Sequence, residues 1–200
     1  MDISIQKSKL HNHQNIQITG SKSESNRLLL LQALYPEILI DNISNSDDSV
    51  LMQKALSSDT EIVDIHHAGT AMRFLTAYFS IQENREVTLT GSSRMKERPI
   101  KILVDALRML GADIRYLEND GFPPIKIIGK NLTERKVSLQ ANVSSQYISA
   151  LLLIASRLEN GLELNLEGKI TSVPYIKMTL SLLNEVGVET SFVDNTIAVK

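Results

Sequence analysis

The segment GSKSESNR, residues 20–27, places Lys22 and Arg27 among three serines directly before the apolar run LLLLQAL. The first turn of a helix carries unsatisfied N–H groups and a partial positive charge, so two cations are favourable there only if an anion lies between them and the helix end. The segment therefore indicates a phosphate or carboxylate site. The alternative is a capping box formed by Ser21 and Glu24, with both cations on a solvated loop.

Three further segments place small polar residues before helix-like stretches: HHAGTAMR (66–73), LTGSSRMKERP (89–99) and SSQ (144–146). Gly69 and Thr70 in the first of them allow a ligand to approach the backbone closely. Since the chain carries a net charge of −2, four neutral or basic helix starts indicate a shared pocket for a multiply anionic small molecule. Each segment taken singly is also compatible with an ordinary helix cap or a solvated turn.

Composition narrows the class of protein. The chain has 200 residues, 42% of them hydrophobic and 22% charged, as is usual for globular proteins. Its charge balance favours neither nucleic acid nor a membrane surface as partner. The absence of cysteine excludes disulfides and thiolate sites, and we expect no metal, because the pair His66-His67 is more often a surface feature than a ligand set. No secretory leader or membrane-length apolar stretch is visible, so we expect a cytoplasmic protein.

The elements that must position these residues follow from hydrophobic periodicity. Helices are predicted over 25–35, 47–57, 70–80, 98–110, 144–157 and 173–186. Period-two alternation and β-branched residues predict strands over 15–19, 37–43, 61–65, 86–90, 113–117, 125–128, 136–140, 162–168 and 188–193. The chain is therefore expected to be an α/β or α+β protein.

An internal repeat refines this expectation. ERPIKILVDALRMLGADI and SVPYIKMTLSLLNEVGVE align with Pro99 on Pro174 and, after one extra residue, Gly111 on Gly187. The helices that begin in SNRLLLLQAL, GTAMRFLTAYF and SSQYISALLLIA are apolar on nearly every side, which is typical of buried helices. Three buried helices alternating with three amphipathic ones indicate a repeated β/α unit arranged around shared inner helices.

Five ordered motifs, GSKSESNR, AGTAMR, LTGSSRMKERP, SSQYISALL and SVPYIKMTL, resemble the N-terminal half of the 5-enolpyruvylshikimate-3-phosphate synthases. The resemblance implies one lobe of the enolpyruvyl transferase fold, with three βαβαββ units around buried inner helices. It also implies transfer of the enolpyruvyl group of phosphoenolpyruvate to the 5-hydroxyl of shikimate 3-phosphate, with release of phosphate and without metal or organic cofactor. The chain departs from the family pattern at His67, where asparagine is common, and at Phe74, where proline is common.

The same resemblance implies roles for individual residues. Lys22 matches a lysine that touches both substrates, and we expect it to be catalytic. The residues matched to shikimate 3-phosphate are Lys22, Ser23, Arg27, Ser144, Ser145, Gln146, Ser172 and Tyr175. Those matched to phosphoenolpyruvate are Lys22, Gly69, Thr70, Arg94 and Gln146.

The length of the chain is about half that of such an enzyme. We therefore expect residues 20–200 to form a monomeric shikimate-3-phosphate-binding lobe that is inactive alone, and residues 1–19 to belong partly to the missing C-terminal lobe. Two alternatives stay open. One is an enolpyruvyl transferase that acts on another acceptor, such as a UDP-sugar. The other is a non-catalytic module that binds a phosphorylated metabolite.

Overall fold

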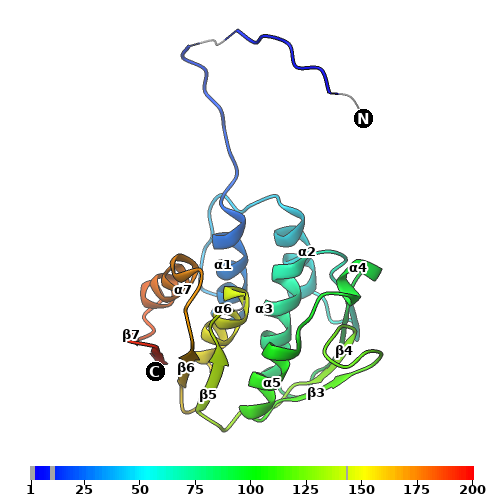
Figure 1. Cartoon of the computed structure of the whole chain (residues 1–200), viewed down its shortest axis with the longest axis vertical. Helices are drawn as coiled ribbons and strands as arrows, with labels where there is room; N and C mark the ends of the chain where they lie inside the picture. The colour runs from blue at the N-terminus through cyan, green and yellow to red at the C-terminus, as the bar shows by residue number, and fades with distance from the viewer. Residues whose placement is uncertain (1–2, 10–11, 143) are drawn as a thin grey trace.

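Two four-stranded mixed sheets and a set of central helices form the body of the chain (Figure 1). The structure is a computed structural model, and it describes residues 3–9, 12–142 and 144–200. The expected α/β class is confirmed. Within the described part of the chain, no helix combines the length and apolar character needed to cross a bilayer.

The first sheet is built from one continuous stretch of chain. Its strands lie in the order β1-β2-β4-β3; β1 and β2 are parallel, and the other two pairings are antiparallel. Two crossover segments connect its first three strands. In chain order the elements are β1 (Ile62–Asp64), α3 (Gly69–Ser80), β2 (Glu86–Thr90), α4 (Ser93–Lys96), α5 (Lys101–Met109), β3 (Asp113–Tyr116) and β4 (Ile125–Ile128).

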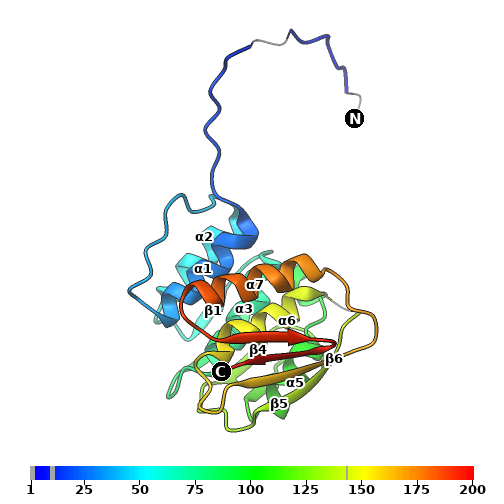
Figure 2. The same cartoon turned by 90° about the vertical axis from the view of Figure 1, so that its left-hand side faces the viewer.

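The second sheet repeats this arrangement. Its order is β5-β6-β8-β7, again with one parallel and two antiparallel pairings, and it lies beside α6 and α7 (Figure 2). The internal repeat is therefore confirmed as two βαβαββ units. In chain order the elements are β5 (Lys136–Gln140), α6 (Ser145–Ala155), β6 (Leu162–Glu167), α7 (Val173–Glu185), β7 (Thr190–Val193) and β8 (Thr196–Val199).

The outer helices of the two units end in the same way. Gly111 and Gly187 follow α5 and α7 with φ of 107° and 87°, a left-handed conformation that glycine adopts without strain. The helix predicted over 98–110 is shorter at its start in the structure. α5 begins at Lys101, after Pro99, because the residue before a proline is disfavoured in the helical region.

The third pair of helices has no sheet. α1 (Lys22–Leu34) packs on α2 (Asp47–Leu56), but the strand predictions over 15–19 and 37–43 are wrong for the structure, where neither range contains a strand. Ile18 and Leu39 are exposed there to 75% and 93%. Alternation alone does not form a strand, because its backbone groups need a paired partner.

Of the three helices predicted to be buried, α3 and α6 are buried along their length, whereas α1 buries seven of its thirteen residues. All twelve residues of α3 are buried, and ten of the eleven residues of α6. α1 lies beside them (Figure 1). The described residues of the N-terminal segment run away from this body and are almost all exposed (Figure 2). Because an inner helix is surrounded by protein along its length, its first turn is the part that can meet a ligand.

Candidate functional site

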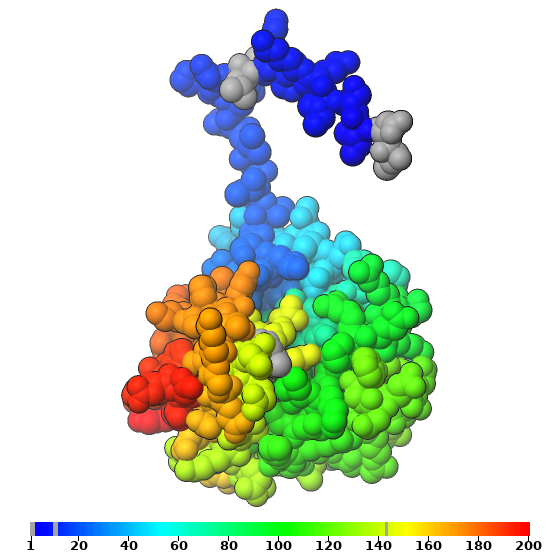
Figure 3. Space-filling model, in the orientation of Figure 1, coloured from blue at the N-terminus to red at the C-terminus, as the bar shows by residue number. Residues whose placement is uncertain are grey.

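Four helices begin around one cavity of about 330 Å³. In Figure 3 the start of α1 (blue), the start of α6 (yellow) and the segment before α7 (orange) adjoin one another on the face toward the viewer. The cavity brings together nine of the eleven residues singled out from the sequence. Its lining is Lys22, Ser23, Arg27, Thr70, Ser144, Ser145, Gln146, Ser172 and Tyr175.

Arg27 is a buried cation without a carboxylate. Its side chain, 3% exposed, donates from Nε to Thr179 Oγ1 (2.8 Å), from Nη2 to Ser149 Oγ (2.8 Å) and from Nη1 to the Ser23 carbonyl (2.6 Å). Within the described residues no acidic group pairs with it. Burial lowers the pKa of Arg27 from its ordinary value to about 10, an effect that the nearby Tyr175 partly opposes. An anion in the cavity would supply the missing counter-charge.

The start of α1 is open to such an anion. Ser21 is the N-cap residue of α1, but its side chain makes no capping hydrogen bond. The alternative of a capping box with Glu24 is therefore wrong. Ser172 at the start of α7 is also without a capping bond, and its φ is 56°, in the left-handed region. Among the described residues, no side chain accepts a capping hydrogen bond from the first turn of either helix.

Lys22 is held near the start of α3 through Asp48. Its Nζ lies 3.8 Å from Asp48 Oδ2, and Asp48 Oδ1 accepts a hydrogen bond of 2.9 Å from the backbone N–H of Thr70. Asp48 thus stabilises the N-terminus of α3 from α2 and keeps Lys22 at the cavity. Half of the Lys22 side chain stays exposed, so its ammonium group is accessible to a ligand.

The SSQ segment forms the wall opposite α1. Ser144 Oγ accepts from the N–H of Gln146 at 3.3 Å and caps α6. Ser145 is buried at the first position of the helix. Gln146 Nε2 donates to Thr70 Oγ1 across 3.1 Å, which joins the starts of α6 and α3. None of these described contacts uses the hydroxyl protons of Ser144 and Ser145, so both serines can donate to a ligand from this wall.

Arg94 lies in a neighbouring cavity rather than in the first one. This second cavity, of about 570 Å³, is lined by His67, Arg94, Met95 and Arg98. Among the described residues, neither arginine has an ion-pair partner. Gly69, which precedes Thr70 of the first cavity, packs against Arg98 of the second, because a Cβ added there would overlap the Arg98 guanidinium. The residues assigned to phosphoenolpyruvate therefore span two adjoining cation-rich hollows.

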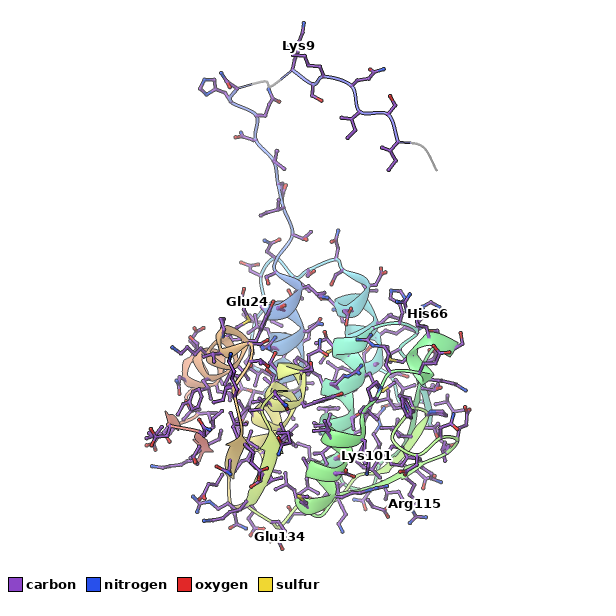
Figure 4. The ribbon with its side chains drawn as sticks, in the orientation of Figure 1. Lys9, Glu24, His66, Lys101, Arg115 and Glu134 are labelled. Carbon is purple, nitrogen blue, oxygen red and sulfur yellow. The ribbon has the colours of Figure 1, made fainter. Side chains whose placement is uncertain are left out.

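The substituted position His67 makes a polar contact of its own. His67 Nε2 lies 3.1 Å from Asp47 Oδ2, and His67 Nδ1 lies 2.6 Å from His66 Nδ1. Figure 4 places His66 toward the end of the body from which the N-terminal segment leaves, and Glu134 at the opposite end. No cluster of three or more His, Cys, Asp or Glu residues in the described ranges is arranged to hold a metal ion.

Sequence reasoning missed several residues that support the site. Arg73 is buried, donates to the carbonyls of Gly69 (3.1 Å) and Pro99 (3.0 Å), and joins the start of α3 to the segment before α5. Burial lowers its pKa, with a smaller opposing effect from Tyr147. For Ser149 the available signal was a polar residue inside the apolar helix α6, and for Thr179 a polar residue among the apolar positions of the amphipathic helix α7.

Comparison with known proteins agrees with the fold and the motifs. The family model described as EPSP synthase (3-phosphoshikimate 1-carboxyvinyltransferase) matches residues 51–200. A 3-phosphoshikimate 1-carboxyvinyltransferase of Bacteroides fragilis is 52% identical over 178 residues, which cover 88% of this chain and 43% of that protein. The enzyme of the same name from Haemophilus influenzae is 41% identical and covers 87% of this chain and 47% of its own length.

A solved structure shows the same fold. The EPSP synthase of Acinetobacter baumannii superposes with a TM-score of 0.76 at 20% sequence identity, over 92% of this chain and 46% of that one. The chain thus spans less than half the length of the curated relatives it matches.

Proposed function

Because this chain belongs to the EPSP synthase family, we propose that it forms the shikimate-3-phosphate-binding lobe of an enolpyruvyl transferase. The reaction moves the enolpyruvyl group of phosphoenolpyruvate to the 5-hydroxyl of shikimate 3-phosphate and releases phosphate, a step of aromatic amino acid biosynthesis. The observation that carries this proposal is the buried, carboxylate-free Arg27 in a cavity where four helices begin.

The acceptor substrate occupies the first cavity. Its two anionic groups are bound by the cations Lys22 and Arg27, by the uncapped first turns of α1 and α7, and by serine hydroxyls. Tyr175 offers its ring as one side of the cavity. The full set is Lys22, Ser23, Arg27, Ser144, Ser145, Gln146, Ser172 and Tyr175.

Phosphoenolpyruvate occupies the junction of the two cavities. Lys22 and Gln146 reach it from the first cavity, Arg94 from the second, and Gly69 and Thr70 lie between them. Lys22 is the catalytic residue of this lobe, since an accessible ammonium group can neutralise charge on both reactants during transfer. No metal or organic cofactor takes part.

The described lining of the first cavity contains no aspartate or glutamate. Proton transfer to the enol carbon and from the 5-hydroxyl needs a positioned acid and base. These groups come from a second, C-terminal lobe, to which residues 1–19 also partly belong, so residues 20–200 bind the acceptor without turnover. The complete enzyme works as a monomer in the cytoplasm.

Isothermal titration with shikimate 3-phosphate tests the acceptor site. We expect weak binding that falls as salt concentration rises, and loss of binding in Arg27→Ala and Ser145→Ala. Arg115→Met is the matched control, because Arg115 pairs with Asp113 at 3.1 Å and lies away from the cavity (Figure 4). UDP-N-acetylglucosamine serves as the competing acceptor, and preferential binding of this sugar nucleotide would assign the chain to another acceptor class.

Turnover is tested by phosphate release. The 200 residues with both substrates are expected to release no phosphate, and addition of a C-terminal lobe from a relative is expected to restore release. Phosphate release by the 200 residues alone would contradict the assignment of acid–base chemistry to the second lobe.

A further inference from the structure

Two buried hydroxyls from two other helices hold Arg27. Ser149 on α6 and Thr179 on α7 are both fully buried, and each accepts a hydrogen bond of 2.8 Å from the guanidinium group. Their oxygens lie 2.9 Å apart. Nε and Nη2 form the side of arginine that a carboxylate commonly takes. Here two neutral hydroxyls occupy the place of the two carboxylate oxygens.

The direction of every hydrogen bond in this network follows from its partners. Thr179 Oγ1 also lies 2.9 Å from the carbonyl of Tyr175, which can only accept, so the single Thr179 proton goes there. Arg27 can only donate. The bond between the two hydroxyls must therefore run from Ser149 to Thr179. The network has one proton arrangement, which fixes the guanidinium and links it to the backbone of Tyr175.

Neutral acceptors leave the charge of Arg27 available. A carboxylate at this place would neutralise the guanidinium and compete with an anionic ligand, whereas hydroxyls orient it without cancelling its charge. The described residues take three of its five N–H groups, and one N–H remains on each terminal nitrogen. Arg27 and Tyr175 both line the first cavity, so the remaining N–H groups can bind a ligand there.

We propose that Ser149 and Thr179 are positioning residues for substrate binding: together they hold Arg27 as a pre-oriented, unneutralised cation for an anionic group of the substrate. The proposal rests on the proposed function for the identity of that substrate. The positioning role can be tested apart from the identity of the substrate, because the orientation of Arg27 is a property of the free chain. Pre-orientation increases affinity by removing the entropic cost of ordering a long side chain on binding.

The first measurement follows the Nε–H signal of Arg27 by NMR in the free 200-residue chain. We expect a slowly exchanging signal in the wild type and in Thr179→Ser, which keeps the hydroxyl, and rapid exchange in Thr179→Val. Thr76→Val is the matched control, since Thr76 is equally buried and donates to the Met72 carbonyl of its own helix at 2.7 Å. A Thr76→Val signal like that of the wild type shows that the effect is local.

The second measurement is affinity. Thr179→Val and Ser149→Ala are each expected to weaken shikimate 3-phosphate binding about tenfold. Thr179→Ser and Thr76→Val are expected to stay within about twofold of the wild type. The double variant is expected to lose little more affinity than the single variant that binds less tightly, because residues that hold one group act as a unit. Full affinity in Thr179→Val and Ser149→Ala would overturn the proposal.

Inorganic phosphate separates this inference from the proposed function. If the wild type fails to bind shikimate 3-phosphate, the acceptor assignment is wrong, but phosphate must still shift the Arg27 Cζ signal, which is observable whatever the rate of N–H exchange, in the wild type more than in Thr179→Val. Equal shifts in these two chains, or no shift in the wild type, would refute the positioning role itself.

Discussion

Replacement of Arg27 by methionine tests whether this arginine serves to bind a ligand or to stabilise the fold. The depression of the Arg27 pKa to about 10 corresponds to about 3 kcal/mol against the charged side chain in the free protein. Its three hydrogen bonds contribute roughly 1 kcal/mol each. The two effects nearly cancel. We therefore expect Arg27→Met to change the free energy of unfolding by less than about 1 kcal/mol, although a buried polar side chain is removed.

The assay is urea unfolding with and without shikimate 3-phosphate. A ligand at 100 times its dissociation constant stabilises the wild type by about 2.7 kcal/mol, and Arg27→Met is expected to lose nearly all of this gain. A loss of more than about 3 kcal/mol in the absence of ligand would refute the reasoning, since Arg27 would then stabilise the fold outright. A ligand-induced gain equal to that of the wild type would refute the role of Arg27 in binding.

Four further predictions follow from particular contacts. Ser21→Ala should change the free energy of unfolding by less than about 0.5 kcal/mol, whereas Ser46→Ala should lower it by about 1 kcal/mol. The reason is that, of these two N-cap serines, Ser46 accepts a capping hydrogen bond from its helix and Ser21 does not. Equal costs in urea unfolding would contradict the uncapped start of α1. Asp48→Asn should weaken shikimate 3-phosphate binding, measured by calorimetry, because it removes the charge that holds Lys22; unchanged affinity would show that Lys22 needs no such partner. Above about pH 10 the unfolded chain holds more protons at Arg27 than the folded one, so the cost of this buried charge is present below about pH 10 and is relieved as pH rises; the wild type should therefore gain stability relative to Arg27→Met as pH rises above 10 in urea unfolding, and a relative loss would give the opposite sign. The Tyr116 hydroxyl is buried without a partner among the described residues, and burial raises its pKa to about 12. Tyr116→Phe should therefore leave the free energy of unfolding unchanged or raise it by up to about 1 kcal/mol, and should remove the loss of stability that ionisation of Tyr116 causes as pH rises from 10 to 12. Clear destabilisation by Tyr116→Phe at neutral pH would indicate a missed hydrogen-bond partner.

Local chemistry let the sequence predict the inner helices and most of the cavity lining. An all-apolar helix must be buried, and its polar first turn must then meet solvent or a ligand; this reasoning located Lys22, Thr70 and Ser145, to which the family resemblance added Tyr175, and all four lie together in the structure. The glycines and prolines that end and begin the outer helices also allowed the repeat to be predicted from the sequence, because their backbone preferences act within one or two residues.

Which segments pair and which residues share a cavity were decided only by the tertiary structure. The strand-like alternation over 15–19 and 37–43 does not form strands, because a strand depends on a neighbour that may lie anywhere in the chain. Likewise, Arg94 was grouped with Lys22 from the sequence but lies in the adjoining cavity.

The same distinction holds inside the site. Arg27 meets Thr179 and Ser149, which are 152 and 122 residues away in sequence, and no local pattern indicates which buried hydroxyl accepts from which cation. Charge, hydroxyl content and helix starts are properties of short segments, so the sequence by itself was enough to predict an anion site and most of its residues. The orientation of its buried cation depends on helices packed together in three dimensions, so only the tertiary structure decided which residues hold it.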